Sequence, residues 1–500
     1  MKRTLALALL VTSGFVGGGS LTAASAAAES CQGKPVTIVG NLDVRTGTEG
    51  DDVVWLMPGN WYEFDARGGN DTICVNKPVT PTGPEPYPPA GRVDAGAGDD
   101  LVVNLWSNSA TGTVTAGLGA GNDTFLGSNV GEHVFADSRA DDGTTRPTGP
   151  STDVITMGGG TDWVETMAPE GGPNQDRIVF GGGEAKVAYT GPMGAGATLD
   201  LGDATTGELQ LPQPGLFGPG EVVVDNAARE VRTQAGVALR WLGDVTRFMI
   251  ERVPVPQPAP ATVSFAGSDL GEYVEIAGLV GDIRLAGGDD HFNLQNFGSS
   301  DLPRSLDGGQ GTDLARLPTA CSKLRIDLSK SMTCSEGASR TTHPFAGFED
   351  VGSTILNSTG KVVLVGTPAA DRLVASAPRV RLEGRGGDDD LDVDDAWHAR
   401  VRAGSGADQV YAQAANLRVW GGKGADRIRL DLLTIAPFGG KSPKKKVLEA
   451  RGGAGRDRLI GSSTGVADRL IGGRGSDHAD GRAGKRDYCV AEKTVRCERP

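Results

Sequence analysis

A glycine-rich hexapeptide that ends in aspartate recurs along most of this 500-residue chain. Two copies lie in AGSGADQVYAQAANLRVWGGKGADRIR, residues 403–429, and end at Asp408 and Asp426. The same pattern leads to ten further aspartates: Asp52, Asp71, Asp100, Asp123, Asp162, Asp290, Asp313, Asp389, Asp457 and Asp477. A unit that returns at a nearly fixed interval predicts a fold of stacked elements, each packed mainly on its neighbours.

The repeat fits a nonapeptide, GGxGxDxUx, in which U is a large apolar residue. The step from Asp408 to Asp426 has the length of two nonapeptides, and the step from Asp389 to Asp408 is one position longer. Glycine permits the positive φ of a tight turn, and the single U can point to a core. Two units then form one coil of a flattened solenoid whose coils are about 4.8 Å apart. We therefore expect an all-β parallel β-roll or β-helix solenoid in which the Gly404 turn stacks on the Gly422 turn.

The motif resembles the nonapeptide of the repeats-in-toxin (RTX) family, the haemolysin-type calcium-binding repeat proteins. The resemblance implies a parallel β-roll with Ca²⁺ between stacked turns, held by aspartate carboxylates and by backbone carbonyls of the glycine positions. Carried onto this sequence, it assigns the carboxylates to the twelve aspartates named above. It assigns the carbonyls to Gly404, Gly406, Gly422, Gly424, Gly453, Gly455, Gly473 and Gly475.

The chemistry of the repeat independently favours calcium as the cofactor. Ca²⁺ is a hard cation that takes six to eight oxygen ligands, and stacked turns supply several each. The formal charge is −14, and an acidic surface suits divalent cations and disfavours nucleic acid as a partner. Metal binding and folding should depend on each other, because stacked acidic turns otherwise repel. Most alternate turns lack the motif, so we expect calcium along one edge of the solenoid.

The N-terminus predicts export. Lys2 and Arg3, the apolar run of residues 5–11 and Ala24-Ser25-Ala26 are typical of a cleaved signal peptide at residues 1–26. No later stretch approaches the roughly 20 apolar residues of a membrane span, so we expect a secreted, extracellular protein. Six cysteines in an exported chain favour disulfides. The expected pairs are Cys321 with Cys334, Cys489 with Cys497, and the remaining Cys31 with Cys74.

The motifs also suggest boundaries along the chain. Calcium-binding repeats occupy residues 27–166 and 266–480, and residues 481–500 carry a cysteine pair without the motif, as a cap on an open solenoid end would. Residues 167–265 show alternating strand patterns and a proline-rich linker at 253–261. This region is either a separate β-domain or the same solenoid with eroded turns. Glu132 and Glu272 occupy the aspartate position in two similar segments, GSNVGEHV and GSDLGEYV.

No catalytic constellation emerges from the sequence. GSSTG, residues 461–465, matches the GxSxG of serine hydrolases with Ser463 as nucleophile, but it lies between repeat turns and no helix pattern follows. The five histidines are scattered and form no HExxH. We expect a non-enzymatic, secreted calcium-binding protein with a structural or surface-interaction role. A polysaccharide- or lipid-active enzyme, or an adhesin for cell-surface or extracellular-matrix glycans, remains the alternative.

Overall fold

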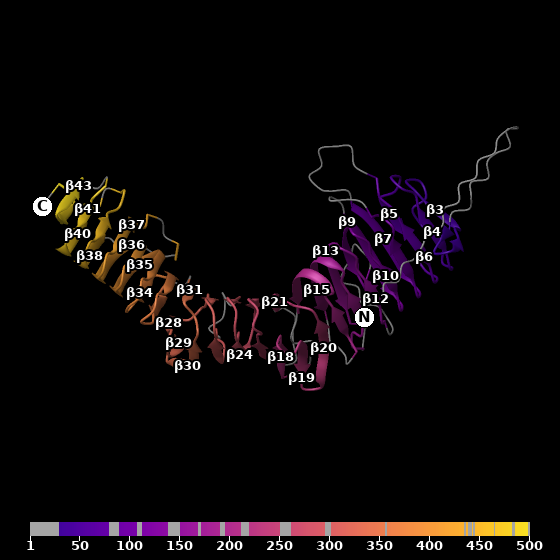
Figure 1. Cartoon of the computed structure of the whole chain (residues 1–500), viewed down its shortest axis with the longest axis horizontal. Coiled ribbons are helices and arrows are strands. Elements are labelled where there is room, and N and C mark those ends of the chain that lie inside the picture. Colours follow the sequence, from indigo (N-terminus) through magenta and orange to yellow (C-terminus); the bar gives the residue numbers. More distant parts are fainter. Residues whose placement is uncertain are drawn as a thin grey trace, which may run out of the picture.

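The computed structural model describes residues 30–79, 90–107, 113–138, 151–168, 172–190, 196–211, 220–250, 262–295, 302–355, 358–434, 437–438, 443, 446–464, 466–482 and 486–498. Every regular element in these ranges is a β-strand, and Figure 1 shows them stacked in one elongated, bent solenoid. The all-β solenoid is confirmed. The expected signal peptide at 1–26, the proline-rich segment at 253–261 and most of the lysine-rich segment at 441–446 lie outside the described residues.

One face of the solenoid, sheet 1, is parallel from end to end. In order, it contains β5 (Glu63–Asp65), β7 (Ala90–Ala97), β9 (Thr113–Ala120), β11 (Gly131–Phe135), β13 (Gly160–Met167), β15 (Gly182–Thr190), β17 (Asp203–Gln210), β21 (Arg247–Ile250), β23 (Tyr273–Ile276), β25 (His291–Leu294), β27 (Leu314–Arg316), β31 (Asp350–Thr354), β33 (Arg372–Ser376), the first halves of β35 (Asp390–Ser405) and β36 (Gln409–Lys423), β37 (Arg427–Leu432), β39 (Arg458–Ile460), β41 (His478–Asp480) and β43 (Lys493–Val495).

The opposite face, sheet 2, is parallel except at two insertions. In order, it contains β3 (Ile38–Gly40), β4 (Val53–Leu56), β6 (Thr72–Val75), β8 (Leu101–Asn104), β10 (Thr124–Leu126), β12 (Val154–Thr156), β14 (Arg177–Val179), β16 (Thr198–Asp200), β20 (Gly236–Leu242), β19 (Glu230–Thr233), β18 (Glu221–Asp225), β22 (Thr262–Ala266), β24 (Val280–Arg284), β26 (Ser305–Asp307), β30 (Ser339–Ala346), β29 (Ser331–Glu336), β28 (Lys323–Asp327), β32 (Lys361–Val365), β34 (Arg379–Glu383), the second halves of β35 and β36, β38 (Val447–Gly455), β40 (Asp468–Gly475) and β42 (Tyr488–Val490).

The two insertions have the same design. The chain forms three antiparallel strands in β18–β20 and again in β28–β30, so that the coil adds three strands to sheet 2 but only one, β21 or β31, to sheet 1. The rod changes direction near β18–β20 (Figure 1). Strands of residues 167–265 pair in parallel with coils on both sides, through β13 with β15 and β21 with β23.

The coil of two nonapeptides is present where the sequence indicated it. Gly404 is the register partner of Gly422, and Gln409 is the partner of Arg427, so the two turns stack directly. Residues at the U position, such as Ile428 and Leu459, are fully buried between the sheets. They belong to one continuous apolar core, as expected when each coil buries its apolar side chains against the next.

The three expected disulfides, Cys31–Cys74, Cys321–Cys334 and Cys489–Cys497, are all confirmed. The first joins β1 (Ser30–Cys31), which pairs with β2 (Lys34–Pro35), to β6. The second closes the insertion β28–β30, and the third closes the C-terminal end of the solenoid. The described residues contain no helix with the length and hydropathy that a membrane crossing requires.

Candidate metal-binding ladders

The aspartates that precede strands of sheet 2 in the N-terminal half are joined into a chain of hydrogen bonds, called ladder 1. The backbone N–H of Asp52 donates to Oδ1 of Asp71, and that of Asp71 donates to Oδ1 of Asp100, each over 2.8 Å. The same bond repeats over 2.8–2.9 Å in the next coils. In order, ladder 1 contains Asp52, Asp71, Asp100, Asp123, Asp153 and Asp176.

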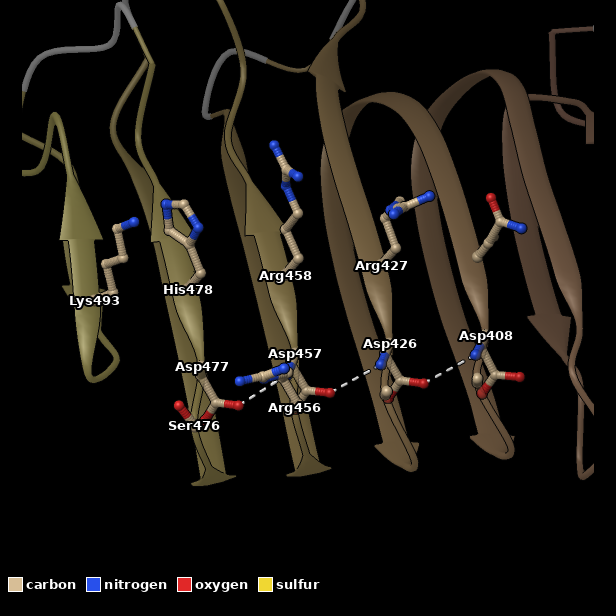
Figure 2. Close-up of a pocket in the computed structure, with 13 residues that line it drawn as sticks. Asp408, Asp426, Arg427, Arg456, Asp457, Arg458, Ser476, Asp477, His478 and Lys493 are labelled. Atoms are coloured by element: carbon tan, nitrogen blue, oxygen red, sulfur yellow. Dashed lines mark hydrogen bonds between the residues drawn. The ribbon is translucent and has the colours of Figure 1, made fainter.

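A second chain of the same kind, ladder 2, precedes the strands of sheet 1. Asp408 donates its N–H to Oδ1 of Asp426 over 3.1 Å, and Asp426 donates to Asp457 over 3.0 Å (Figure 2). Ladder 2 runs through Glu272, Asp290, Asp313 and Glu349, and then through Asp371, Asp389, Asp408, Asp426, Asp457, Asp477 and Glu492. Ladder 2 thus has two segments with four ends, and a glutamate stands in the aspartate position at three of these ends.

The two ladders lie on opposite edges of the solenoid. The turn that ends at Asp71 leads from β5 in sheet 1 to β6 in sheet 2, whereas the turn that ends at Asp426 leads from β36 in sheet 2 to β37 in sheet 1. The expectation of a single edge is wrong. Asp162 is already on the edge of ladder 2, where its Oδ1 accepts the N–H of Glu132 over 3.0 Å. The motif fixes the shape of a turn but does not encode which sheet follows it.

In most of these acids, the second carboxylate oxygen is buried without a hydrogen-bond donor among the described residues. This holds for Oδ2 of Asp71, Asp100, Asp123, Asp153, Asp162, Asp290, Asp313, Asp389, Asp408, Asp426, Asp457 and Asp477. An ionised carboxylate accepts at about four lone-pair positions, and leaving one oxygen buried and unpaired costs on the order of 1–3 kcal/mol or more. A row of such oxygens calls for a proton or a cation at each step.

In most of these turns, the residue four positions before the acid has a positive φ. Before Asp426 this residue is Gly422 with φ +127°, and before Asp389 it is Arg385 with φ +82°. Non-glycine residues with positive φ, Arg67, Ala286 and Arg385, take this same position before Asp71, Asp290 and Asp389. A left-handed non-glycine residue costs on the order of 1 kcal/mol, and such strain gathers at functional sites. We call these positive-φ turns.

A second class of turn, the Ser/Thr turn, has serine or threonine at that position, and this residue donates to the carboxylate. The N–H of Thr48 donates to Oδ2 of Asp52 over 2.8 Å, and the hydroxyl of Thr48 donates to the same oxygen over 2.9 Å. The same pattern occurs between Thr367 and Asp371. At the glutamates of the repeated segments, Ser128 and Ser268 donate to Oε1 of Glu132 and Glu272, but Oε2 of each glutamate has no donor among the described residues. The Ser/Thr turn therefore satisfies the carboxylates of Asp52 and Asp371, and only one oxygen of each glutamate.

Burial raises the pKa of several ladder aspartates, and neighbouring carboxylates raise it further. The pKa of Asp123 and Asp290 rises to about 8, and that of Asp389 and Asp426 to about 7. Hydrogen bonds from the preceding coil lower these pKa values without cancelling the effect of burial. Near neutral pH, the ladders therefore favour either protonation or a bound cation.

An exposed row of acceptors runs beside the buried one, one residue earlier in each turn. Oδ1 of Asp99 accepts the N–H of Asn122, and Oδ1 of Asp51 accepts the N–H of Asn70, each over 2.8 Å. Asp289 plays the same part toward Thr312. These acids belong to the sequence doublets DD, and only the second, buried member of each doublet was assigned from the sequence.

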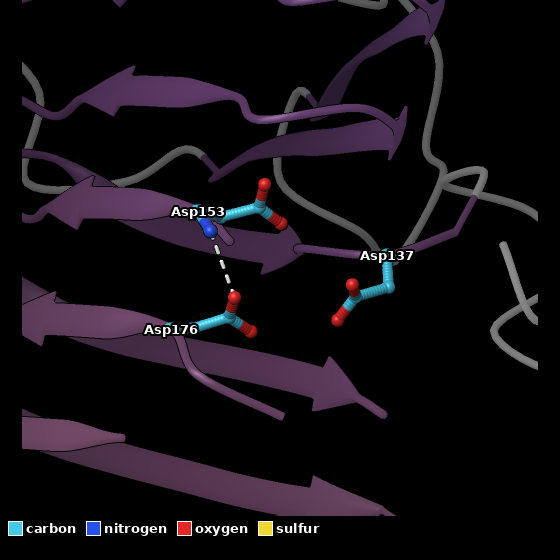
Figure 3. Close-up of side chains that lie close together, drawn as sticks. All are labelled: Asp137, Asp153 and Asp176. Atoms are coloured by element: carbon cyan, nitrogen blue, oxygen red, sulfur yellow. Dashed lines mark hydrogen bonds between the residues drawn. The ribbon is translucent and has the colours of Figure 1, made fainter. Parts of the chain in front are cut away.

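Ladder 1 ends in a cluster of three buried aspartates, Asp137, Asp153 and Asp176, whose carboxylates face one another (Figure 3). One oxygen from each lies within 4.8 Å of the others. The N–H of Asp153 donates to Oδ1 of Asp176 over 2.8 Å, and Oδ2 of Asp137 accepts the N–H of Met167 over 2.8 Å. Oδ1 of Asp137 and Oδ2 of Asp153 have no donor among the described residues. Burial and the charge of Asp176 raise the pKa of Asp137 to about 7.

The atoms along both ladders suit a hard cation. Buried carboxylate oxygens without donors alternate with glycine carbonyls: the Oδ2 of Asp426 lies where a side chain on Gly421 would be, and the carbonyl oxygen of Gly404 lies where a side chain on Gly422 would be. Ca²⁺ and Mg²⁺ prefer all-oxygen sites of this kind. Within the described ranges, three acids come together only at Asp137, Asp153 and Asp176, so elsewhere backbone carbonyls must complete any site.

The candidate residues for catalysis are dispersed. The side chain of Ser463 is exposed, whereas the N–H of its neighbour Ser462 donates to Asp468 over 2.7 Å, and the N–H of Asp468 in turn donates to Oδ1 of Asp487 over 2.8 Å. His133 stacks on Trp163 at a centroid distance of 4.1 Å, and its Nε2 lies 2.9 Å from Glu165. The GSSTG segment and His133 are therefore both part of the surface of the repeats.

Most members of the ladders could be found from the sequence, and several could not. The twelve assigned aspartates all lie at the start of a strand. Eleven of them belong to ladder 1 or ladder 2, and Asp162 is hydrogen-bonded to Glu132. Acids that do not complete the GxGxD pattern were missed: Asp137, Asp153, Asp176, Asp371, Asp487, Glu349, Glu492 and Glu498. For Asp153, Asp176 and Asp371 the signal was present, because each is followed two residues later by a buried apolar residue, as in DVI, DRI and DRL.

Comparisons with known proteins add no family to these observations, since neither the protein-family models nor the curated proteins gave a match to the chain.

Proposed function

We propose that the chain is an exported calcium-binding solenoid of the repeats-in-toxin type, with a structural or surface-interaction role. The observation that carries the proposal is the row of buried, donorless carboxylate oxygens that recurs coil after coil in the described residues. A fold gains nothing from such oxygens unless something neutralises them. The aspartates and glycine carbonyls of the positive-φ turns would hold the ion, and Ca²⁺ would supply the positive charge that these oxygens lack.

The same residues explain why binding and folding are coupled. Asp408 and Asp426 meet only when two coils stack, because their hydrogen bond joins consecutive coils. The unfolded chain therefore has no preformed site, and the binding free energy becomes folding free energy. Extracellular sites of this kind commonly have Kd values of about 10⁻⁴–10⁻³ M, so export would expose the chain to enough calcium to fold it. The expected signal peptide and the three disulfides support an oxidising, extracellular location.

The two turn classes predict where calcium binds. Positive-φ turns leave an oxygen for the metal. The Ser/Thr turns at Asp52 and Asp371 satisfy their own carboxylates, whereas those at Glu132 and Glu272 satisfy only Oε1 and leave Oε2 without a donor among the described residues. Coils with the turns at Asp52 and Asp371 would keep the solenoid continuous without calcium. The buried cluster of Asp137, Asp153 and Asp176 is the best candidate for a tight site, because three carboxylates converge there.

Calcium titration of the mature chain tests the proposal. Isothermal titration calorimetry should show several ions bound per chain, and removal of calcium with EGTA should reduce the β-signal in circular dichroism and lower the Tm. Magnesium at equal concentration should substitute poorly, because it resists dehydration and demands octahedral geometry. An unchanged spectrum and Tm after complete removal of calcium would exclude calcium-dependent folding.

A further inference from the structure

The outer face of sheet 2 carries two straight rows of cations in the C-terminal half. Register pairs place Lys323, Lys361, Arg379 and His398 in one row across β28, β32, β34 and β35. A second row, two positions further along the same strands, contains Arg325, Arg381, Arg400 and Arg418, with Val363 between the first two. Adjacent strands of a sheet are about 4.8 Å apart, so each row is a regularly spaced line of positive charge.

Much of this charge has no carboxylate partner in the part of the chain that the structure describes. No ion pair of the described residues involves Lys323, Lys361, Arg379 or Arg400, whereas Arg381 pairs with Glu383 and Arg418 pairs with Glu449. The pKa of Lys361 is lowered by partial burial and by the charges of Lys323, Arg381, Arg379 and Arg400. The pKa of His398 is lowered by burial and by Arg379 and Arg400. The like charges repel one another, and an anion would relieve this repulsion.

A shallow groove lies along these rows. Its volume is about 730 Å³, its cationic lining comes from Lys361, Arg379, Arg381, Arg400 and Arg418, and the imidazole of His398 lies among them. Among the described residues that line it there is no aspartate or glutamate, although the chain has 63 acidic and 49 basic residues. Pro443, which precedes β38, forms part of the rim. A cationic groove in an acidic chain concentrates its field on one face.

We infer that this groove, called the cationic groove, binds a linear anionic polysaccharide, one that carries carboxylate or sulfate groups at regular intervals. A small anion would meet only two or three of the charges, whereas a chain laid across the strands would meet both rows. Arginine binds carboxylate and sulfate oxygens with two parallel N–H donors, and four arginines, Arg379, Arg381, Arg400 and Arg418, are clustered here. The rigid sheet holds these side chains in register before the ligand arrives, which lowers the entropy cost of binding.

The lining argues against nucleic acid. Proteins that bind single strands provide aromatic side chains on which bases stack, and no Phe, Tyr or Trp lines the cationic groove in the described part of the chain. Sequence-specific duplex binding inserts a helix or ribbon into a DNA groove, and a flat sheet face offers neither.

Dextran sulfate is the probe, and uncharged dextran with the same backbone is the control ligand. The full mature chain, held at constant calcium, should bind dextran sulfate and not dextran in calorimetry, and binding should weaken as salt is raised. The double variant Arg379→Gln with Arg400→Gln should bind at least about tenfold more weakly, since charge-assisted hydrogen bonds contribute on the order of 1.5–3 kcal/mol each. The smaller number of contacts should also reduce its salt dependence.

A matched variant removes the same charge from sheet 1. Arg427→Gln with Arg458→Gln changes two exposed arginines beside ladder 2, in neighbouring coils (Figure 2), and should bind dextran sulfate like the parent chain. Circular dichroism and Tm in calcium confirm that both variants fold. Equal loss in both variants, no loss in either, or no binding of dextran sulfate at low salt would overturn the inference. Tighter binding of single-stranded DNA through Arg379 and Arg400 would overturn the choice of polysaccharide.

Discussion

At the scale of a single residue, Asp426 combines two opposing demands. Its Oδ1 accepts the N–H of Asp408 over 3.1 Å, which requires only an oxygen, while its Oδ2 is buried with no donor among the described residues. Burial raises its pKa to about 7. An amide at this position would keep the first bond and remove the charge.

Asp426→Asn therefore separates a structural role from a metal-binding role. Without calcium the variant should be as stable as the parent or slightly more stable, because a buried charge is gone. With calcium it should be less stable, and calorimetry should find about one ion fewer per chain. The control is Ser463→Ala, an exposed change that should alter neither quantity. Equal destabilisation with and without calcium would show that Asp426 serves only the hydrogen-bonded ladder.

Single residues were predicted well where the motif is complete and poorly where it is not. Asp408 and Asp426 follow two glycines each, so their positions could be read directly. Asp153 and Asp176 join ladder 1 although neither has a glycine two residues before it, so their segments do not match the repeat motif. Arg67, Ala286 and Arg385 adopt positive φ against their own preference, and no pattern in one sequence reveals a conformation imposed by stacking.

At the scale of the turn, the close contact between stacked glycines contributes more to stability than the positive φ that they adopt. A Cβ on Gly422 would overlap the carbonyl oxygen of Gly404, and its φ is +127°. Gly422→Ala should therefore destabilise the chain by more than the roughly 1–3 kcal/mol of a strained φ alone, and calcium should not restore it. Gly236→Ala is the matched control, because Gly236 has φ +117° and no atom within 4 Å of the added Cβ. Equal Tm losses in the two variants would contradict the importance of turn stacking.

The regular elements were predictable and the insertions were not. Coils of two nonapeptides and the three disulfide pairs follow from spacing and from cysteine count. The antiparallel strands β18–β20 and β28–β30 have the same alternating pattern as solenoid strands, so the sequence does not distinguish a hairpin from another coil. The cationic rows have a sequence signal, since Lys361, Arg379 and His398 recur at about one coil length. That interval has meaning only once the coil length is known.

At the scale of the whole molecule, the stacked coils sort charge by position. Acids repeated at the turns form buried ladders on two opposite edges, while bases repeated at outward positions of sheet 2 form the cationic groove. Both arise from the same cause, since any residue type repeated once per coil becomes a straight line along the solenoid. The edges and the face are therefore independent surfaces, and a substitution on one should leave the other unchanged.

The response of the molecule to pH follows from the raised pKa values of both ladders. Because Asp71, Asp123, Asp290, Asp389 and Asp426 have a pKa of about 7 or 8 when folded, the folded chain binds more protons than the unfolded chain, whose aspartates titrate near 3.8. Without calcium, the free energy of unfolding should consequently fall as pH rises from about 4 to about 8. Calcium competes with these protons, so the stabilisation that it adds should grow over the same interval. Tm measured in EGTA and in calcium at about pH 5 and about pH 8 tests both signs. If the Tm in EGTA instead rises with pH, then the ladder carboxylates are stabilised as anions by the fold itself and need no metal.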